Sequence, residues 1–269
     1  MSEQEKTAKA ADSRSKGSSL LRSSGIVGIM TMLSRILGLV RDVVVANYFG
    51  ASGSADAFFV AFKIPNFLRR LFAEGAFSQA FVPVLSEYRT QRDHAAVKAL
   101  VDRVAGTLGL TLITVTALAV LGAPLLTALF APGFYMAGGE KFDLAADMLR
   151  ITFPYLLLIS LTAFAGAILN SYERFAVPAF TPVLLNLTLI SSAVFLSPLF
   201  EQPILALAWG VMIAGVVQLV FQLPFLARLK LMPCPVVDRS DEGVRRILKL
   251  MLPALFGVSV TQINLLLDT

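Results

Sequence analysis

The feature that most constrains this chain is a series of apolar segments longer than a soluble core requires. Each exceeds the roughly 17 residues that a helix needs to cross about 30 Å of hydrocarbon. None shows the strict apolar–polar alternation of a membrane β-barrel strand. The sequence therefore predicts an all-α integral membrane protein, a polytopic helical bundle, with spans at residues 24–49, 55–85, 104–131, 148–171, 176–199, 203–227 and 247–269.

Composition supports the same fold class and argues against an enzyme. Hydrophobic residues make up 56% of the chain and charged residues only 15%, whereas soluble domains average about 25% charged. A single cysteine, Cys234, and a single histidine, His94, exclude a disulfide framework and a histidine–cysteine metal cluster. His94 lies beside Arg92 and Asp93 in the most polar stretch. We interpret it as a loop residue and expect a transporter.

The distribution of Lys and Arg between the connections predicts the orientation. If successive connections alternate sides, one side holds sixteen Lys and Arg and the other holds only Lys141. Basic residues concentrate in cytoplasmic loops, so the amino terminus is predicted to be cytoplasmic. Topology and anionic headgroups thereby account for the net charge of +5. We therefore expect membrane lipids as partners and no nucleic acid.

Polar stretches divide the chain into four parts. Residues 1–22 are rich in Ser, Lys, Ala and Glu and predict a disordered cytoplasmic tail. Residues 23–229 would form a six-helix transmembrane lobe, and residues 230–246 a cytoplasmic linker. Residues 247–269 would begin a seventh helix. Because six spans precede the linker, a second six-span unit would be a parallel repeat, and we expect the sequence to be part of a longer protein.

Charged residues inside the apolar segments point to a function. A central Arg or Lys costs about 2.5–3.5 kcal/mol in lipid, so these side chains should face a watery interior. For Arg70, four residues before Glu74, and for Arg150, near the end of its span, a local ion pair or snorkelling is the simpler interpretation. Arg35, Arg41 and Arg69 instead suggest an anionic ligand, because the planar guanidinium matches phosphate oxygens.

Spacing alone does not place these charges in one cavity. Asp56, Lys63 and Arg70 recur every seven residues and should share a stripe of one helix. Pro65 should interrupt that helix, because its ring clashes with the carbonyl of Ala61. Arg35 and Arg41 are six residues apart and point about 120° apart on an ideal helix. The remaining polar residues of the spans predict interhelical hydrogen bonds: Asn170, Asn186, Gln218 and Gln262.

Two long stretches make the sequence specific. The run from Ser23 to Pro83 (SSGIVGIMTMLSRILGLVRDVVV…AFSQAFVP) and the run from Pro154 to Asn186 resemble proteins of the MurJ (MviN) family, as does QLPFLARLK. The resemblance spans everything except the tail. It implies the fold of the MOP flippase superfamily, with two six-helix lobes around a central cavity, of which this chain would hold the first lobe and the start of the seventh helix.

The family resemblance also implies a substrate, a site and a location. It implies transport of lipid II, an undecaprenyl-pyrophosphate-linked disaccharide pentapeptide, from the inner to the outer leaflet of the bacterial cytoplasmic membrane. The family's cavity arginines fall on Arg35, Arg41 and Arg69, and its acidic positions on Asp42 and Asp56. A further arginine of the second lobe would lie beyond Thr269. Secondary candidates for substrate contacts are Lys63, Asn66, Arg70 and Glu74.

The implied mechanism is alternating access. The three arginines would bind the pyrophosphate, while Asp42 and Asp56 hold and compete for them as the lobes rock. Nothing resembles a nucleotide-binding loop, so no cofactor is expected. Membrane potential or a sodium or proton gradient would supply energy. Asp268 is either a cation ligand or a residue at the end of a truncated helix. Cell-wall synthesis or division proteins are candidate partners.

Three alternatives stay open from the sequence. The first is a flippase for another polyprenyl-pyrophosphate-linked glycan, or a drug exporter, within the same superfamily; a cationic cavity disfavours cationic drugs. The second is an intramembrane enzyme acting on such a lipid, which would need a buried nucleophile–base pair or a carboxylate metal site. The third is a scaffold without transport activity, which would tolerate neutral replacements of the cavity arginines.

Overall fold

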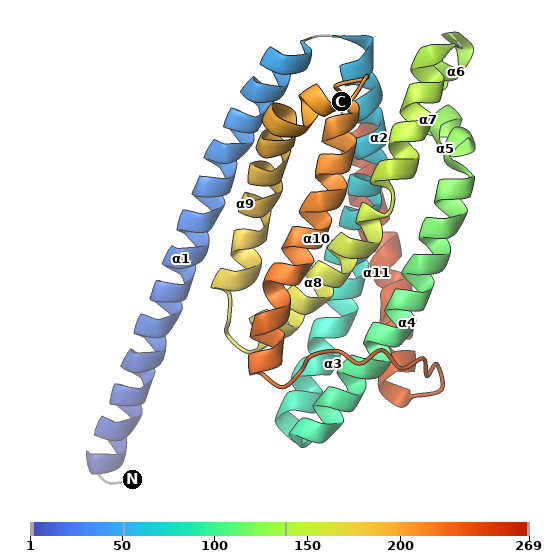
Figure 1. Cartoon of the computed structure of the whole chain (residues 1–269). Helices are drawn as coiled ribbons and strands as arrows, with labels where there is room; N and C mark the ends of the chain where they lie inside the picture. Colours follow the sequence, from blue (N-terminus) through green and yellow to red (C-terminus); the bar gives the residue numbers. More distant parts are fainter. Residues whose placement is uncertain (1–2, 51, 138, 268–269) are drawn as a thin grey trace.

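The computed structural model describes the backbone of residues 3–50, 52–137 and 139–267, and side chains from Ser24 to Gly257 except at positions 51, 72–74, 137 and 138. The described part is helical and has no strand (Figure 1). Its elements are α1 (Glu3–Phe49), α2 (Gly53–Arg69), the π-helix η1 (Arg70–Phe77), α3 (Ser78–Gln91), α4 (His94–Leu121), α5 (Ala123–Phe130), α6 (Pro132–Ala137), α7 (Glu140–Thr152), α8 (Tyr155–Ser171), α9 (Ala176–Ser191), the π-helix η2 (Ser192–Leu196), the 3-10 turn η3 (Ser197–Leu199), α10 (Leu205–Arg228) and α11 (Glu242–Leu267).

Each predicted span lies largely within helical structure, but several helices are longer than the apolar segments. The helix α4 begins at His94, ten residues before the apolar segment, because Asp93 caps it by accepting a hydrogen bond from the backbone N–H of Ala96 (3.0 Å). Within the described residues, four helical stretches are long and apolar enough to cross a membrane: 94–121, 140–171, 176–199 and 205–228.

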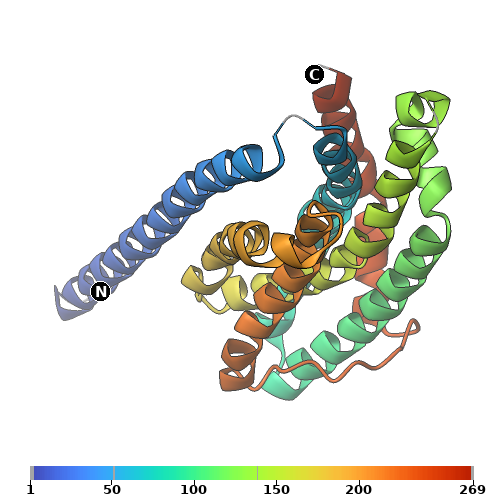
Figure 2. The ribbon, with the colours of Figure 1, turned by 45° about the horizontal axis from the view of Figure 1, so that its top comes forward.

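The first helix differs from the prediction for the amino terminus. Disorder was expected for residues 1–22, whereas α1 begins at Glu3 and continues without a break to Phe49. Ala, Lys, Glu and Gln have high intrinsic helix propensity, which favours an extension of the helix through this segment. Figures 1 and 2 show this part of α1 projecting away from the other helices.

The bundle packs around two apolar clusters. One joins α2, α7, α8 and α10 and includes Phe153 and Leu149, which are almost fully buried. The other joins η1, α3, α4, α8 and the start of α11 around Phe81 and Phe164, whose rings lie 5.1 Å apart. By contrast, α1 lies along α9 and away from α2 (Figures 1 and 2). This arrangement leaves one face of α1 without a helix against it.

The proline in the second span is accommodated by a neighbouring helix. Residues 53–69 remain helical through Pro65, although its ring leaves the carbonyl of Ala61 without its usual helix partner. The hydroxyl of Thr152 on α7, which is fully buried, donates a hydrogen bond to that carbonyl (3.1 Å). The irregular backbone follows later, in the π-helix η1. Asp56 and Lys63 on α2 are exposed, and so is Arg70, which already lies in η1; the predicted stripe shared by the three residues stays a prediction.

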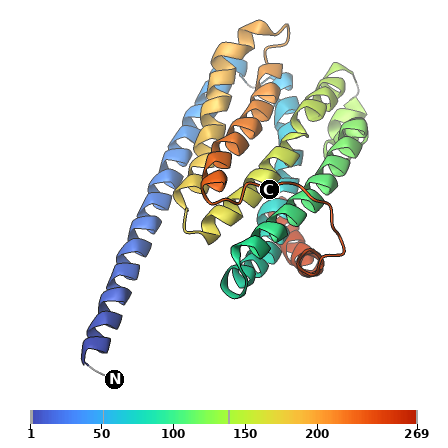
Figure 3. The ribbon, with the colours of Figure 1, turned by 60° about the horizontal axis from the view of Figure 1, so that its bottom comes forward.

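The linker between α10 and α11 is bound tightly to the lobe. We call residues 230–241 the strap; they cross the surface of α4 (Figures 1 and 3). The backbone N–H groups of Cys234 and Val236 donate to the carboxylate (2.7 Å) and the carbonyl (3.0 Å) of Asp102. A Cβ on Gly106 would lie 2.3 Å from the carbonyl oxygen of Val236, so only glycine permits this approach. The strap therefore has one defined seat on α4.

Ion pairs fix the carboxyl-terminal end of the strap and the start of α11. Arg103 on α4 pairs with Asp241 (2.7 Å) and with Asp238 (3.5 Å). The hydroxyl and backbone N–H of Ser240 donate to Asp238 and, with Arg103 nearby, hold the pKa of that carboxyl below its ordinary value. In α11, Arg246 donates to Glu87 of α3 (2.8 Å) and lowers the pKa of Glu87 in the same way.

Candidate functional site

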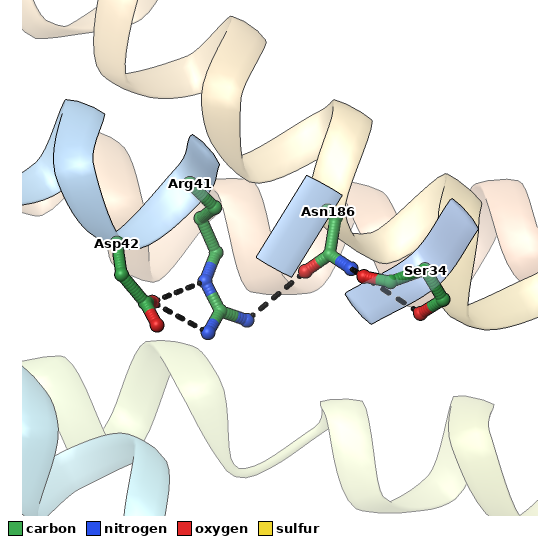
Figure 4. Close-up of polar contacts among 4 residues, drawn as sticks. All are labelled: Ser34, Arg41, Asp42 and Asn186. Atoms are coloured by element: carbon green, nitrogen blue, oxygen red, sulfur yellow. Dashed lines mark hydrogen bonds and ion pairs between the residues drawn. The ribbon is translucent and has the colours of Figure 1, made fainter. Parts of the chain in front are cut away.

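The structure places Arg41 on the seam between α1 and α9. Its guanidinium donates to the carboxylate of Asp42 (2.6 and 2.9 Å) and to the side-chain oxygen of Asn186 on α9 (3.1 Å), as Figure 4 shows. The Arg41 side chain is 27% exposed, and the Asp42 side chain is 62% exposed. The pair is therefore partly sheltered on the arginine side and open on the carboxylate side.

Asn186 orients Arg41 from the neighbouring helix. Its amide nitrogen donates to the backbone carbonyl of Ser34 (2.9 Å), so the amide bridges α1 and α9 while its oxygen faces Arg41 (Figure 4). The residue is 5% exposed. A Cβ added at Gly38 would stand 3.8 Å from the same amide nitrogen. The interhelical hydrogen bond predicted for Asn186 is confirmed, but the sequence did not reveal that it also positions Arg41.

Arg69 occupies a different place from Arg41. It lies in the last turn of α2, is half-buried, and donates from Nε to the side-chain oxygen of Asn66 (3.3 Å). It lines an open cavity of about 730 Å³, whose other walls come from α3, α8, α9 and α10. Arg41 and Arg35 do not line this cavity. Arg35 is exposed on α1, on another face of the helix from Arg41.

The acidic and secondary candidates fall in two groups. Asp42 contacts Arg41, whereas Asp56 pairs with Lys141 at the start of α7 (2.9 Å). The structure thus brings Asp56 to the α1–α2 end of the bundle and pairs it with a lysine, not with a cavity arginine. Lys63 and Arg70 are exposed. The side chain of Glu74, and all of Asp268, lie outside the described residues, so their predicted roles stay predictions.

Neutral polar side chains of the cavity were not recognised as a site from the sequence. Gln218 and Gln222 lie one turn apart on α10 and are 2% and 1% exposed. The amide of Gln218 donates to the carbonyl of Thr181 on α9 (2.8 Å), which confirms its predicted interhelical bond. The sequence pattern that could have identified them is a pair of glutamines four residues apart within a long apolar span, because such residues share one face of a helix.

Comparison with known proteins decides the family. A family model described as "Lipid II flippase MurJ" matches residues 45–269. A protein of Vibrio cholerae named "Probable lipid II flippase MurJ" is 55% identical over 256 residues, which cover 93% of this chain and 49% of that protein. The chain belongs to the MurJ family. A Burkholderia cenocepacia relative named "Lipid II flippase MurJ" is 46% identical over 254 residues, again 93% of this chain and 49% of the relative.

Solved structures agree with membership of the MurJ family. A structure titled "Lipid II flippase MurJ, inward closed conformation" aligns with a TM-score of 0.73 at 33% identity, over 90% of this chain and 49% of that one. A MOP superfamily transporter of Pyrococcus furiosus aligns with a TM-score of 0.67 at 16% identity, over 90% and 52%. At that identity the likeness shows the fold alone. The chain spans about half the length of the curated relatives it matches.

Proposed function

We propose that this chain is the amino-terminal lobe of a lipid II flippase of the bacterial cytoplasmic membrane. Membership of the MurJ family carries the proposal, together with the guanidinium of Arg41, which is held partly exposed at the seam between α1 and α9. In this proposal Arg35, Arg41 and Arg69 bind the pyrophosphate of the substrate, because a guanidinium donates two parallel hydrogen bonds to phosphate oxygens. The isoprenoid chain stays in lipid.

We infer a cytoplasmic amino terminus from the grouping of basic residues. The amino-terminal end of α1, the α3–α4 connection and the strap lie at one end of the bundle (Figures 1 and 3). This end carries the basic connections, whereas Lys141 lies at the other end against Asp56. Basic connections favour the cytoplasmic side. The lobe would then present its pyrophosphate ligands first to the inner leaflet and, after a rocking motion against the second lobe, to the outer one.

Export of lipid II in cells tests this proposal. Cells depleted of their own flippase would carry the full-length protein, and the accessibility of lipid II at the outer leaflet would be measured. Replacing Arg35, Arg41 and Arg69 together by Ala should stop export while the protein remains inserted. Arg150→Ala is the matched control, because Arg150 pairs with Asp147 on its own helix. Normal export by the triple variant would refute the assigned site.

A further inference from the structure

The cavity that Arg69 lines has the size of a ligand site. Its volume of about 730 Å³ falls within the range of about 300–1,000 Å³ typical of small-molecule sites. Its walls come from α3, α8, α9 and α10, so it lies inside the lobe, apart from the Arg41 seam. Apolar and aromatic side chains form part of the wall, and hydroxyl and amide groups form the rest.

Some hydrogen-bonding groups of this wall are buried acceptors without a partner. The side-chain oxygens of Gln218 and Gln222 are buried and accept no hydrogen bond from any described residue. The amide nitrogen of Gln218 already donates to Thr181. The hydroxyl protons of Thr162 and Thr181 go to carbonyls of their own helices, at Leu158 and Pro178 (both 2.8 Å). Four side-chain oxygens therefore remain able to accept, and buried acceptors without partners are unfavourable.

This balance selects the chemistry of a ligand. An anion such as phosphate would meet Arg69, but it carries no proton to donate to the buried side-chain oxygens of Gln218 and Gln222. A cation would meet no carboxylate among the lining residues and would be repelled by Arg69. A neutral group rich in hydroxyl and amide protons fits, because each proton finds an acceptor and Tyr155 supplies apolar surface.

We propose that this cavity binds a sugar ring of the substrate, the N-acetylated hexosamine joined to the pyrophosphate. The inference rests on the proposed function, which supplies a glycan attached directly to a diphosphate. Arg69 links the two parts, since it lines the cavity and is one of the proposed pyrophosphate ligands. The sugar would donate to Gln218, Gln222, Thr162 and Thr181 while the diphosphate stays near the guanidinium. Recognition of the glycan would thus be a property of this lobe.

Binding to two lipids that differ only in the glycan tests the proposal. The full-length protein in nanodiscs would be titrated with lipid II and with undecaprenyl pyrophosphate, which has no sugar. Gln222→Met removes one acceptor at similar volume, and the loss of one hydrogen bond corresponds to about a 3- to 10-fold weaker affinity. We expect this loss for lipid II and an unchanged affinity for undecaprenyl pyrophosphate. Thr162→Val, an isosteric change, should behave in the same way if Gln222→Met folds poorly.

Control variants separate this inference from the proposed function. Thr116→Val alters a buried hydroxyl that is likewise unpartnered but does not line the cavity, and it should leave both affinities unchanged. Arg41→Ala should weaken both lipids equally. Equal affinities of Gln222→Met and the unaltered protein for lipid II would show that the cavity holds only water, and would overturn the inference. Failure of the unaltered protein to bind either lipid would overturn the proposed function, and this inference with it.

Discussion

Two regions of the lobe use arginine in opposite ways. In the strap region, Arg103 and Arg246 pair with carboxylates from distant parts of the chain: Arg103 with Asp238 and Asp241, and Arg246 with Glu87. At the Arg41 seam, the contact between helices is with a neutral amide, Asn186, and among the side chains that the structure describes the carboxylate in contact is that of the sequence neighbour Asp42. Charge is neutralised across elements in the first region and only locally in the second.

The difference indicates what each arrangement can do. Cross-element ion pairs fix a geometry and leave no charge for a ligand, which suits a segment that holds one position on α4. A neutral amide fixes the direction of a guanidinium without neutralising it. Because Asp42 is 62% exposed and contacts Arg41 from the same helix, the proposed function requires only that a phosphate displace this one local partner. The comparison predicts that changes at the seam alter binding, whereas changes at the strap alter local order.

The largest effect is expected when the charge at the seam is removed. Arg41→Ala in the full-length protein should weaken binding of undecaprenyl pyrophosphate by about 10- to 100-fold, as expected for hydrogen bonds between charged groups. Protease resistance of the strap should not change. Arg103→Ala should do the reverse, with more rapid cleavage between residues 230 and 241 and unchanged lipid affinity. If Arg103→Ala weakened lipid binding as much as Arg41→Ala, the two regions would not have separate roles.

A pair of glycines on α4 tests the seat of the strap. A methyl group at Gly106 would lie within 2.7 Å of three backbone atoms of Val236, whereas Gly109 has nothing within 4 Å. Overpacking of this kind costs about 1–3 kcal/mol. Gly106→Ala should therefore raise the rate of proteolysis in the strap. Gly109→Ala should be neutral or stabilising by up to about 1 kcal/mol, because alanine favours helix. Equal cleavage of the two variants would contradict the observed contact.

The fold could be predicted from the sequence because its cause is local. A membrane helix can be predicted from a run of about twenty apolar residues without knowledge of the helices that pack against it. The predicted spans fell largely within helical structure. The extension of α4 back to His94 was not predicted, because an apolar count does not include a polar first turn. The position of the strap on α4 was not predicted either, because the contact of Gly106 with Val236 joins positions 130 residues apart.

The site could be predicted only as a set of residue types. Uncompensated arginines in apolar segments singled out Arg41 and Arg69, but their partners depend on which helices are neighbours. Asn186 lies 145 residues from Arg41, and no sequence spacing relates them. Asp56 had the residue type expected of a partner for the arginines, yet it pairs with Lys141, because α2 packs against α7. Residue type limits which kinds of partner a charged side chain can have, and the arrangement of the helices decides which partner it contacts.

A smaller effect is expected when only the orientation of Arg41 is lost. Asn186→Leu removes the amide that directs the guanidinium, and one hydrogen bond to a side chain corresponds to about a 3- to 10-fold weaker lipid affinity. Asn186→Asp instead gives Arg41 a carboxylate partner on the neighbouring helix, as Arg103 has in the strap region. This carboxylate would compete with phosphate for Arg41. The affinity of this variant should fall further at low salt and recover partly at high salt. Thr188→Val, on the same helix and bonded within it, is the control.

The smallest expected effect is that of low pH on the proteolysis of the strap. The pKa values of Glu87 and Asp238 are lowered by hydrogen bonds from Arg246 and Ser240 respectively, so these contacts stabilise the folded strap above the ordinary carboxyl pKa. That contribution is lost as pH falls through the lowered values. Cleavage of the strap by an acid-active protease should rise about two- to fivefold between about pH 5 and pH 3, a modest change because exposed ion pairs contribute little. Glu87→Gln should reduce this rise. The contact of Arg41 with the other helix is a hydrogen bond to the neutral amide of Asn186. The hydrogen-exchange protection factors of residues 184–188, corrected for the intrinsic pH dependence of exchange, should therefore stay constant over the same range. A parallel fall in protection there would show that the seam also depends on cross-helix charge.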